Sequence, residues 1–381
     1  MEVGDYGAPE WGDARRTPGP HGYTAFFPAP LPRSLALDST VVLALSRADI
    51  ALGRLAGAGR LLPEPQLLTV PYATREALAS SRIEGTQASL TDVFEASVTG
   101  ASNADTEEVI NYIAALARGR ELLSTLPIGV RMLRQCHAVL LSGVRGEIKT
   151  PGELRTTQNW IGRGRRSSLD DALFVPPPVA ALQDGLADWE RFVNEPPELP
   201  VLVRAAVMHY QFETLHPFLD GNGRLGRLLI ALLLEQEKVL PEPLLYVSAA
   251  LERDRDTYYS CLQGLRERGD VQRWLLFFLT AVAGEAQDAI ERAERLLDLR
   301  EDYRDRLRGR RSRAVEIIDL LMANPLTTTT AVQRRLGVTT QGAAHLLSQL
   351  VEAEIVTVSE GRQGQPRRYR AGQLLEALEV G

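Results

Sequence analysis

A glycine-rich turn before a long apolar segment constrains this chain more than any other feature. The turn is Gly221-Asn222-Gly223, in the stretch HPFLDGNGRLGRLLIALLL, and residues from about Arg224 to Glu237 have the apolar spacing of a helix. Glycine and asparagine adopt positive φ at little cost, so successive backbone N–H groups in the turn can face one anion. The unpaired N–H groups at the start of the helix add to that site. The sequence therefore predicts a phosphate-binding turn at the N-terminus of a buried helix.

Side chains suited to phosphoryl or nucleotidyl transfer flank this turn. His216 can act as a base near neutral pH, and Asp220 can be an oxygen ligand for Mg²⁺. Arg224 and Arg227 are three residues apart and share one face of the predicted helix, where they can bind phosphate oxygens. The alternative is a capped turn with surface arginines and a chance histidine. The convergence of these residue types within about a dozen positions favours a nucleotide site.

The segment HPFLDGNGRLGR, residues 216–227, resembles the signature of Fic-domain proteins, His-Pro-Phe-x-Asp/Glu-Gly-Asn-Gly-Arg-x-x-Arg, at every fixed position. The resemblance implies a mainly α-helical core and transfer of AMP from ATP to a protein hydroxyl. It also implies that His216 is the general base and that Asp220 holds Mg²⁺. The residues it implies in nucleotide binding are Gly221, Asn222, Gly223, Arg224, Leu225, Gly226 and Arg227.

A second motif lies upstream, where TREALASSRIEG favours a helix that ends at Gly85, a residue suited to a helix C-terminal cap. Ser80 and Glu84 are four residues apart and lie on one face near the end of this helix. Taken alone, Glu84 is a charged surface residue. The run from Ser80 to Gly85 nevertheless resembles the inhibitory motif of Fic proteins, Ser/Thr-x-x-x-Glu-Gly/Asn. The resemblance implies that Glu84 pairs with Arg227 and blocks the γ-phosphate.

Two further segments are similar to Fic proteins in a less specific way. Between Gly146 and Pro178, PGELRTTQNWIG and FVPPP resemble the flap that aligns target residues by adding an extended segment to an exposed edge. A surface loop held by Trp160 and Phe174 is the alternative. RDTYYSCL resembles the helix beside the adenine, which makes Tyr258 the predicted neighbour of the nucleobase. A core tyrosine is the alternative at this position, and the residues leave both choices open.

The 381 residues, 44% of them hydrophobic, are enough for two or three domains. We expect a disordered lead over residues 1–22, an N-terminal helical region over 23–125 with the inhibitory helix at about 74–85, the catalytic core over 126–284, and a charge-dense linker helix over 285–311. Residues 312–381 have the pattern of three helices and two strands, which predicts a winged helix-turn-helix. The expected fold class is mainly α, with a small β-hairpin flap in the core.

Composition restricts the partners of the chain. A formal net charge of −6 disfavours a general nucleic-acid binder, and seven arginines within residues 312–381 are balanced by seven acidic residues. The two cysteines, Cys136 and Cys261, have no metal or redox spacing, no apolar run reaches the roughly 18 residues of a membrane-spanning helix, and the N-terminus lacks a hydrophobic signal core. We therefore expect a cytoplasmic protein with no membrane contact. A homodimer, and DNA bound by the C-terminal region, both stay open.

Together these features predict an autoinhibited protein adenylyltransferase that uses ATP and Mg²⁺. Its substrate would be a Ser, Thr or Tyr hydroxyl of a protein, itself included. The alternative is a DNA-binding transcriptional regulator whose nucleotide site senses ATP. A Fic enzyme that uses another nucleotide, or that removes AMP, is a further alternative.

Overall fold

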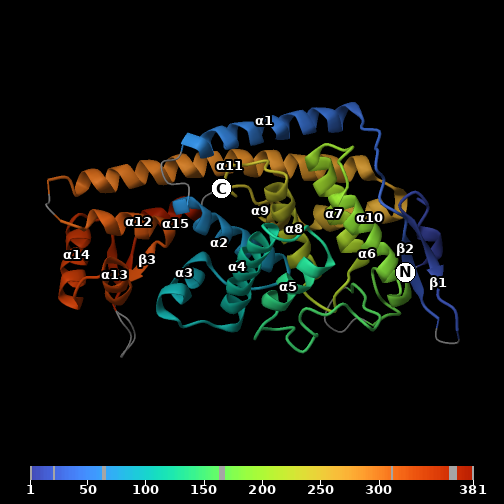
Figure 1. The fold of residues 1–381 in the computed structure, drawn as a ribbon, viewed down its shortest axis with the longest axis horizontal. Helices are drawn as coiled ribbons and strands as arrows, with labels where there is room; N and C mark the ends of the chain where they lie inside the picture. Colours follow the sequence, from blue (N-terminus) through green and yellow to red (C-terminus); the bar gives the residue numbers. More distant parts are fainter. Residues whose placement is uncertain are drawn as a thin grey trace.

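A helix of 36 residues, α11 (Val271–Arg306), runs along the molecule with α1 (Ser39–Leu61) beside it (Figure 1). The computed structural model describes residues 2–19, 22–61, 66–162, 168–309, 312–359 and 367–379. Residues 285–306, predicted as a linker, continue the same helix as the core segment before them. They are charge-dense, but several of them, among them Ala289, Ala293 and Leu296, are buried like the first part of α11.

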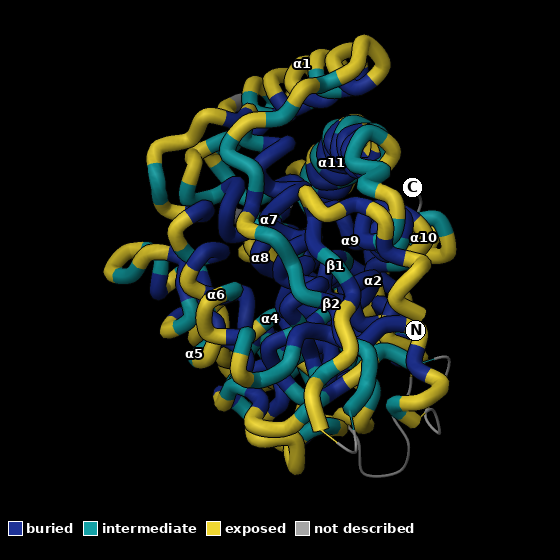
Figure 2. Tube along the Cα trace, turned by 90° about the vertical axis from the view of Figure 1, so that its right-hand side faces the viewer, coloured by how far each residue is buried: buried dark blue, intermediate teal, exposed yellow. Residues whose placement is uncertain are grey.

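Two adjacent helices, α7 (Val201–Leu215) and α8 (Asn222–Gln236), form the centre of the core. Every residue from Leu202 to Leu215 is buried, because α7 is enclosed on all sides by other elements. Figure 2 shows the buried segments gathered around α7 and α8, while the outward side of α1 is exposed. The other helices of this region are α2 (Gln66–Ile83), α3 (Leu90–Thr99), α4 (Ala104–Leu123), α5 (Val130–Leu140), α6 (Val179–Asn194), α9 (Ser248–Arg253) and α10 (Arg255–Arg268).

The N-terminal residues are ordered, so the prediction of a disordered lead is wrong for the described part of residues 1–22. A short 3-10 helix, η1 (Val3–Asp5), is followed by two antiparallel strands, β1 (Gly12–Arg16) and β2 (Thr24–Pro28). Trp11 is buried and meets the Tyr210 ring edge-on, with centroids 5.5 Å apart. Aromatic anchors such as Trp11 offset the ordering entropy of a segment that has no apolar periodicity of its own.

The predicted flap contains less β-structure than a hairpin. Among the described residues between Gly146 and Pro178, a single isolated bridge joins Ile161 to Phe174, and the rest of the segment is irregular. The Phe174 side chain is buried beside Phe26 of β2, with ring centroids 5.8 Å apart. The segment is therefore held by side-chain packing more than by a strand ladder.

The C-terminal elements gather at the end of the molecule opposite β1 and β2 (Figure 1). Three helices and two strands occur in the predicted order, and a short strand and a final helix were not predicted. The three strands form one antiparallel sheet in the order β3-β5-β4. The elements are α12 (Val315–Ala323), β3 (Leu326–Thr328), α13 (Thr329–Leu336), α14 (Thr340–Glu352), β4 (Thr357–Ser359), β5 (Arg368–Arg370) and α15 (Gly372–Glu379).

This C-terminal region is docked on the N-terminal helices. Helix α12 packs against α2, and α15 packs against α11. Asn324 donates hydrogen bonds to Phe94 O (3.2 Å) and Ser97 Oγ (2.8 Å) on α3, and Arg368 of β5 forms an ion pair with Glu95. Within the described ranges, no helix has both the length and the apolar character needed to cross a membrane.

Candidate functional site

The predicted phosphate-binding turn joins α7 to α8. His216 ends α7 with a left-handed backbone (φ 46°, ψ 60°), and Gly221 precedes α8 with φ 75°. The Asn222 side chain closes the loop, because its Oδ1 accepts from Phe218 N (2.9 Å) and its Nδ2 donates to Phe218 O (2.8 Å). The buried Phe218 ring stacks on His137 of α5, with centroids 3.9 Å apart. The turn is thus fixed to the helix that begins within it.

His216 is poised as a neutral base. Burial lowers the pKa of its imidazole to about 4, so the ring is uncharged at neutral pH. Its Nδ1 faces the carbonyl oxygen of Glu213 at 3.4 Å, an orientation in which Nδ1 donates. The Nε2 lone pair then remains available to accept a proton.

Asp220 lies at the mouth of the turn with 41% of its side chain exposed. Its Oδ1 accepts from Gly221 N (2.7 Å), and its backbone oxygen accepts from His137 Nε2 (3.0 Å). Among the described residues, no group of three His, Cys, Asp or Glu side chains could hold a metal ion. Mg²⁺ usually takes one or two carboxylates together with substrate phosphates. Asp220 therefore fits this ion as one ligand of a metal–nucleotide complex.

Arg227 is occupied by residues from the segment that ends α2. Its Nε donates to Ser80 Oγ (2.8 Å), and its Nη2 donates to Ser80 O and to Glu84 Oε1, both at 2.8 Å. A side-chain carbon on Gly223 would lie 2.3 Å from Glu84 Oε1, so the carboxylate rests directly over the turn. Burial favours a raised pKa for Glu84, but the Arg227 guanidinium outweighs it and holds the pKa below its ordinary value. Glu84 is therefore an anion placed against the predicted anion site.

Arg224 is buried and faces a carboxylate that the sequence did not indicate. Its Nη1 lies 3.5 Å from Glu108 Oε2 of α4, and its Nε and Nη1 have no hydrogen-bond partner in the described part of the chain. Glu108 also accepts from Thr86 Oγ1 (2.8 Å) and pairs with Arg145 (3.1 Å). No local spacing relates Glu108 to the turn, because α4 meets α8 only in the folded chain. The free donors of Arg224 are suited to a phosphate.

The burial of Tyr258 favours the alternative of a core tyrosine over a neighbour of the nucleobase. Its side chain is fully buried, and its hydroxyl lies 2.7 Å from Nε2 of His209, whose Nδ1 lies 3.0 Å from Gly226 O. The adjacent Tyr259 is 39% exposed, and the charges of Glu84 and Arg227 act on its hydroxyl. Tertiary packing of α10 decides which of two neighbouring tyrosines faces the core, so Tyr259 presents the accessible ring.

Two other predicted nucleotide-binding residues serve in packing. The Leu225 side chain is fully buried, and its N–H donates to Gly221 O within α8 (3.0 Å). A side-chain carbon on Gly226 would lie 2.3 Å from Glu213 Oε1, so this glycine allows α7 and α8 to approach closely. Glu213 was not predicted from the sequence, and burial raises its pKa to about 7.

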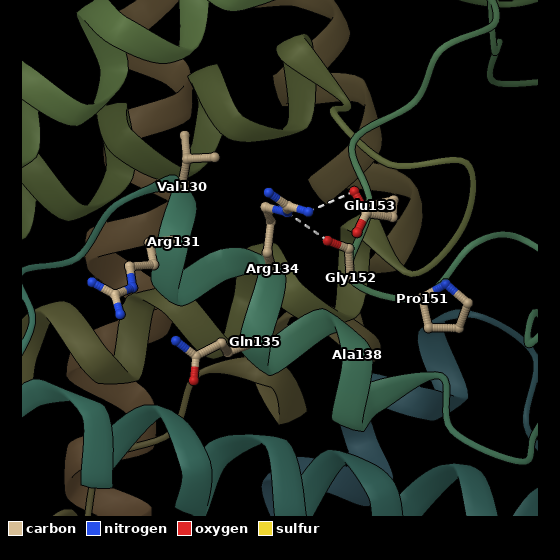
Figure 3. A pocket seen from close by; sticks show the side chains of 8 residues that line it. All are labelled: Val130, Arg131, Arg134, Gln135, Ala138, Pro151, Gly152 and Glu153. Atoms are coloured by element: carbon tan, nitrogen blue, oxygen red, sulfur yellow. Dashed lines mark hydrogen bonds and ion pairs between the residues drawn. The ribbon is translucent and has the colours of Figure 1, made fainter.

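A separate surface cavity of about 520 Å³ lies along the outer face of α5 (Figure 3). In this view Arg134 reaches across to the loop at residues 152–153, where its Nε donates to Gly152 O (2.8 Å) and its Nη2 pairs with Glu153 (2.5 Å). The lining contains none of residues 216–227. The cavity is therefore distinct from the turn and its arginines.

Comparison with known proteins identifies related sequences over the same region. The model of the Fic/DOC family N-terminal region matches residues 42–121, and the Fic/DOC family model matches residues 127–234. The protein adenylyltransferase fic-1 of Caenorhabditis elegans is 31% identical over 143 residues, which is 37% of this chain and 24% of that protein. A probable protein adenylyltransferase of Aquifex aeolicus is 29% identical over 110 residues, 28% of this chain and 32% of its own. The chain thus matches only a quarter to a third of the length of these curated relatives.

Solved structures share the fold at low sequence identity. A Fic family protein from Desulfovibrio desulfuricans G20 aligns with a TM-score of 0.58 and 21% identity, over 88% of this chain and 97% of that one. A Fic domain containing signaling protein from Bacteroides thetaiotaomicron aligns with a TM-score of 0.52 and 17% identity, over 67% and 98% of the two chains. At these identities the likeness concerns the fold, and it confirms the predicted mainly α-helical class.

Proposed function

Because this chain belongs to the Fic/DOC family, we propose that it is an autoinhibited protein adenylyltransferase, which transfers AMP from ATP to a hydroxyl group of a protein. The observation that carries the proposal is the meeting of a neutral histidine, a glycine turn and two buried arginines at the start of α8. The names of the curated relatives agree with this activity. Those relatives are matched over only part of their length, so a labelling experiment decides the activity of the whole chain.

His216 would take the proton of the attacking hydroxyl. The hydroxyl oxygen forms a bond to the α-phosphorus of ATP while the bond from that phosphorus to the pyrophosphate oxygen breaks. The proton passes to Nε2 of His216, and pyrophosphate leaves with the bonding electrons. The pKa of about 4 keeps the imidazole free of a proton before the reaction at neutral pH.

The turn and the arginines would stabilise the charge that develops during transfer. Backbone N–H groups at Gly221–Gly223 and the start of α8 are already oriented, so they bind phosphate oxygens without reorganisation. Nε and Nη1 of Arg224, which have no hydrogen-bond partner among the described residues, would serve the same purpose. Asp220 would hold Mg²⁺, which supplies positive charge to the phosphates when it is bound.

Glu84 would inhibit the enzyme by competing with ATP for Arg227. Its carboxylate accepts from Nη2 of that arginine and lies over Gly223, so a phosphate cannot use the same donor at the same time. Arg227 is 1% exposed, and its remaining hydrogen bonds go to Ser80 of the same segment. Displacing Glu84 would return one arm of the guanidinium to the nucleotide.

The position of a radioactive label in ATP tests the reaction type. The Glu84→Gly variant should incorporate label from ATP labelled at the α-phosphorus and none from ATP labelled at the γ-phosphorus. The additional change His216→Ala should abolish this incorporation while the protein remains folded. Label taken only from the γ-position would indicate a phosphoryl transferase and contradict the proposal, as would incorporation that survives the loss of His216.

A further inference from the structure

Arg155, from the segment that follows α5, binds three consecutive carbonyl groups of the loop that carries His216. Its backbone N–H donates to Pro217 O (2.9 Å), its Nε donates to His216 O (3.0 Å), and its Nη2 faces Leu215 O (3.4 Å). The side chain is 2% exposed, so these bonds form away from bulk water. Burying an arginine costs desolvation free energy, and here the guanidinium binds carbonyl groups and no carboxylate. The cost suggests that the backbone geometry it fixes has a function.

Asn159, further along the same irregular segment, also binds carbonyl groups of this loop. Its Nδ2 donates to His216 O (3.0 Å) and to Phe218 O (2.8 Å), and the residue is 9% exposed. The carbonyl groups of residues 215–218 are therefore all bound by two residues, Arg155 and Asn159. His216 O receives two side-chain donors, one from each of these residues.

The backbone of His216 needs such support. Its φ of 46° lies in the left-handed region, which residues with a Cβ adopt at a cost in energy. The His216 N–H is already bound to Phe212 O (3.0 Å), so the carbonyl is the other end at which the residue can be held. A carbonyl that relaxes toward the right-handed region would rotate the Cα–Cβ bond and swing the imidazole away from the turn.

We propose that Arg155 and Asn159 are positioning residues for the catalytic histidine, holding its strained backbone so that Nε2 faces the reacting hydroxyl. The inference rests on the proposed function, in which His216 is the base. The Arg155 guanidinium also donates to Pro177 O (2.5 Å), at the far end of the segment that resembles the flap. One side chain therefore fixes both ends of that segment against the catalytic loop.

Arg155 also acts on the imidazole through its charge. Burial is the largest cause of the lowered pKa of His216, and the cations Arg266 and Arg155 lower it further, whereas Glu84 opposes them. Removing the Arg155 cation should raise the pKa of His216, so the acid limb of the pH–rate profile should move to higher pH. Asn159 is neutral, so its removal should disturb the geometry without that displacement.

The test is transfer of AMP from α-labelled ATP in the Glu84→Gly background, measured at saturating ATP from pH 4 to 8. Arg155→Met should lower the transfer rate by about 10- to 100-fold, because a misplaced base loses alignment, and should move the acid limb upward. Asn159→Leu should lower the transfer rate without moving the acid limb of the pH–rate profile. Arg155→Lys keeps the cation but not the fork of donors, so it should lower the rate less and leave the limb unmoved. The dissociation constant for ATP should stay within about threefold in all three, because the hydrogen bonds of Arg155 and Asn159 go to residues 215–218 and not to Gly221–Gly223.

Arg134→Met is the matched control, since Arg134 holds the neighbouring residues 152–153 (Figure 3) and its hydrogen bonds among the described residues go to Gly152 and Glu153. Its rate should stay within about twofold of the parent. An Arg155→Met enzyme that is as fast as its parent contradicts the inference. A purely structural role would lower the rate and the ATP affinity together and leave the pH–rate profile where it is. That result for Arg155→Met would also contradict the inference. If Arg155→Met does not fold, Arg155→Lys and Asn159→Leu decide by the same criteria. Equal labelling by the parent and its His216→Ala variant would instead refute the proposed function.

Discussion

Oε1 of Glu84 lies 2.8 Å from Nη2 of Arg227, and the same oxygen rests over Gly223 in the first turn of α8. The two residues come from different elements, the turn after α2 and the second turn of α8. Because Arg227 is buried and Ser80 accepts from its Nε and Nη2, the carboxylate and an incoming phosphate compete for the side of the guanidinium that faces Gly223.

Arg227→Ala should not gain activity, although it breaks the same ion pair as Glu84→Gly. In the proposed mechanism the arginine is both the target of the inhibitory carboxylate and a ligand for ATP, so its loss should lower transfer by about tenfold or more relative to Glu84→Gly. The double variant should match Arg227→Ala alone, because residues in direct contact give non-additive effects. Rates of α-label incorporation for the four proteins of this cycle provide the measurement. A double variant as active as Glu84→Gly would show that Arg227 does not bind the nucleotide.

The Glu84–Arg227 pair should stabilise the fold in a pH-dependent way. The folded-state pKa of Glu84 is lowered, so the contribution is fully present above the unfolded value of about 4.3 and is lost as the pH falls through the folded pKa. We expect about 1 kcal/mol at pH 7, a modest value because a third of the side chain is exposed. The free energies of unfolding of the wild type and Glu84→Gln should differ at pH 7 and converge near pH 3. A difference that persists unchanged at pH 3 would exclude a charge-based contribution.

Asp220→Asn should weaken metal-linked nucleotide binding and leave the loop intact. The amide oxygen can still accept from Gly221 N, but it carries no charge for Mg²⁺. The dissociation constant for ATP in the presence of Mg²⁺ should rise by about tenfold, equivalent to about 1.4 kcal/mol. The same titration in EDTA is the control, where the two proteins should agree. Equal affinities under both conditions would remove Asp220 from the metal site.

Substitution of Tyr258 should affect the stability of the fold, whereas substitution of the adjacent Tyr259 should affect ATP binding. Tyr258→Phe removes the hydroxyl beside His209 Nε2 and should lower the free energy of unfolding by about 1–2 kcal/mol, with ATP affinity unchanged. Tyr259→Ala should weaken ATP binding by about three- to tenfold through loss of a ring face, while Tyr259→Phe retains it. Thermal unfolding and ATP titration of the three variants separate the roles. Weaker ATP binding in Tyr258→Phe alone would reverse the assignment.

Local chemistry made part of the site predictable. Gly221 and Asn222 encode the turn by their own conformational preferences, and the spacing of Arg224 and Arg227 places both on one face of α8. The partners of Arg227 could not be predicted in this way, because Ser80 lies on α2 and Glu84 lies in the turn after it. Only the family resemblance indicated that pairing, which no spacing in the sequence encodes.

The remaining residues could not be predicted because their roles arise from contacts between distant elements. Glu108 reaches Arg224 from α4, and Arg155 binds the carbonyl groups of the catalytic loop from another segment. Trp11 orders the N-terminal strands by packing on Tyr210 of α7, which periodicity within residues 1–22 cannot show. The charge-dense second part of α11 differs in composition from its apolar first part, although both belong to one helix and both contain buried residues.

The most direct test of the account is the initial rate of AMP incorporation into protein by the wild type and Glu84→Gly at saturating ATP and Mg²⁺. If Glu84 holds Arg227 away from ATP, Glu84→Gly should be faster by about tenfold or more, equivalent to at least about 1.4 kcal/mol of activation free energy. Glu84→Gly with the additional change His216→Ala gives the background of the assay. Equal rates for the wild type and Glu84→Gly, both above that background, would mean that the ion pair over Gly223 does not control the enzyme.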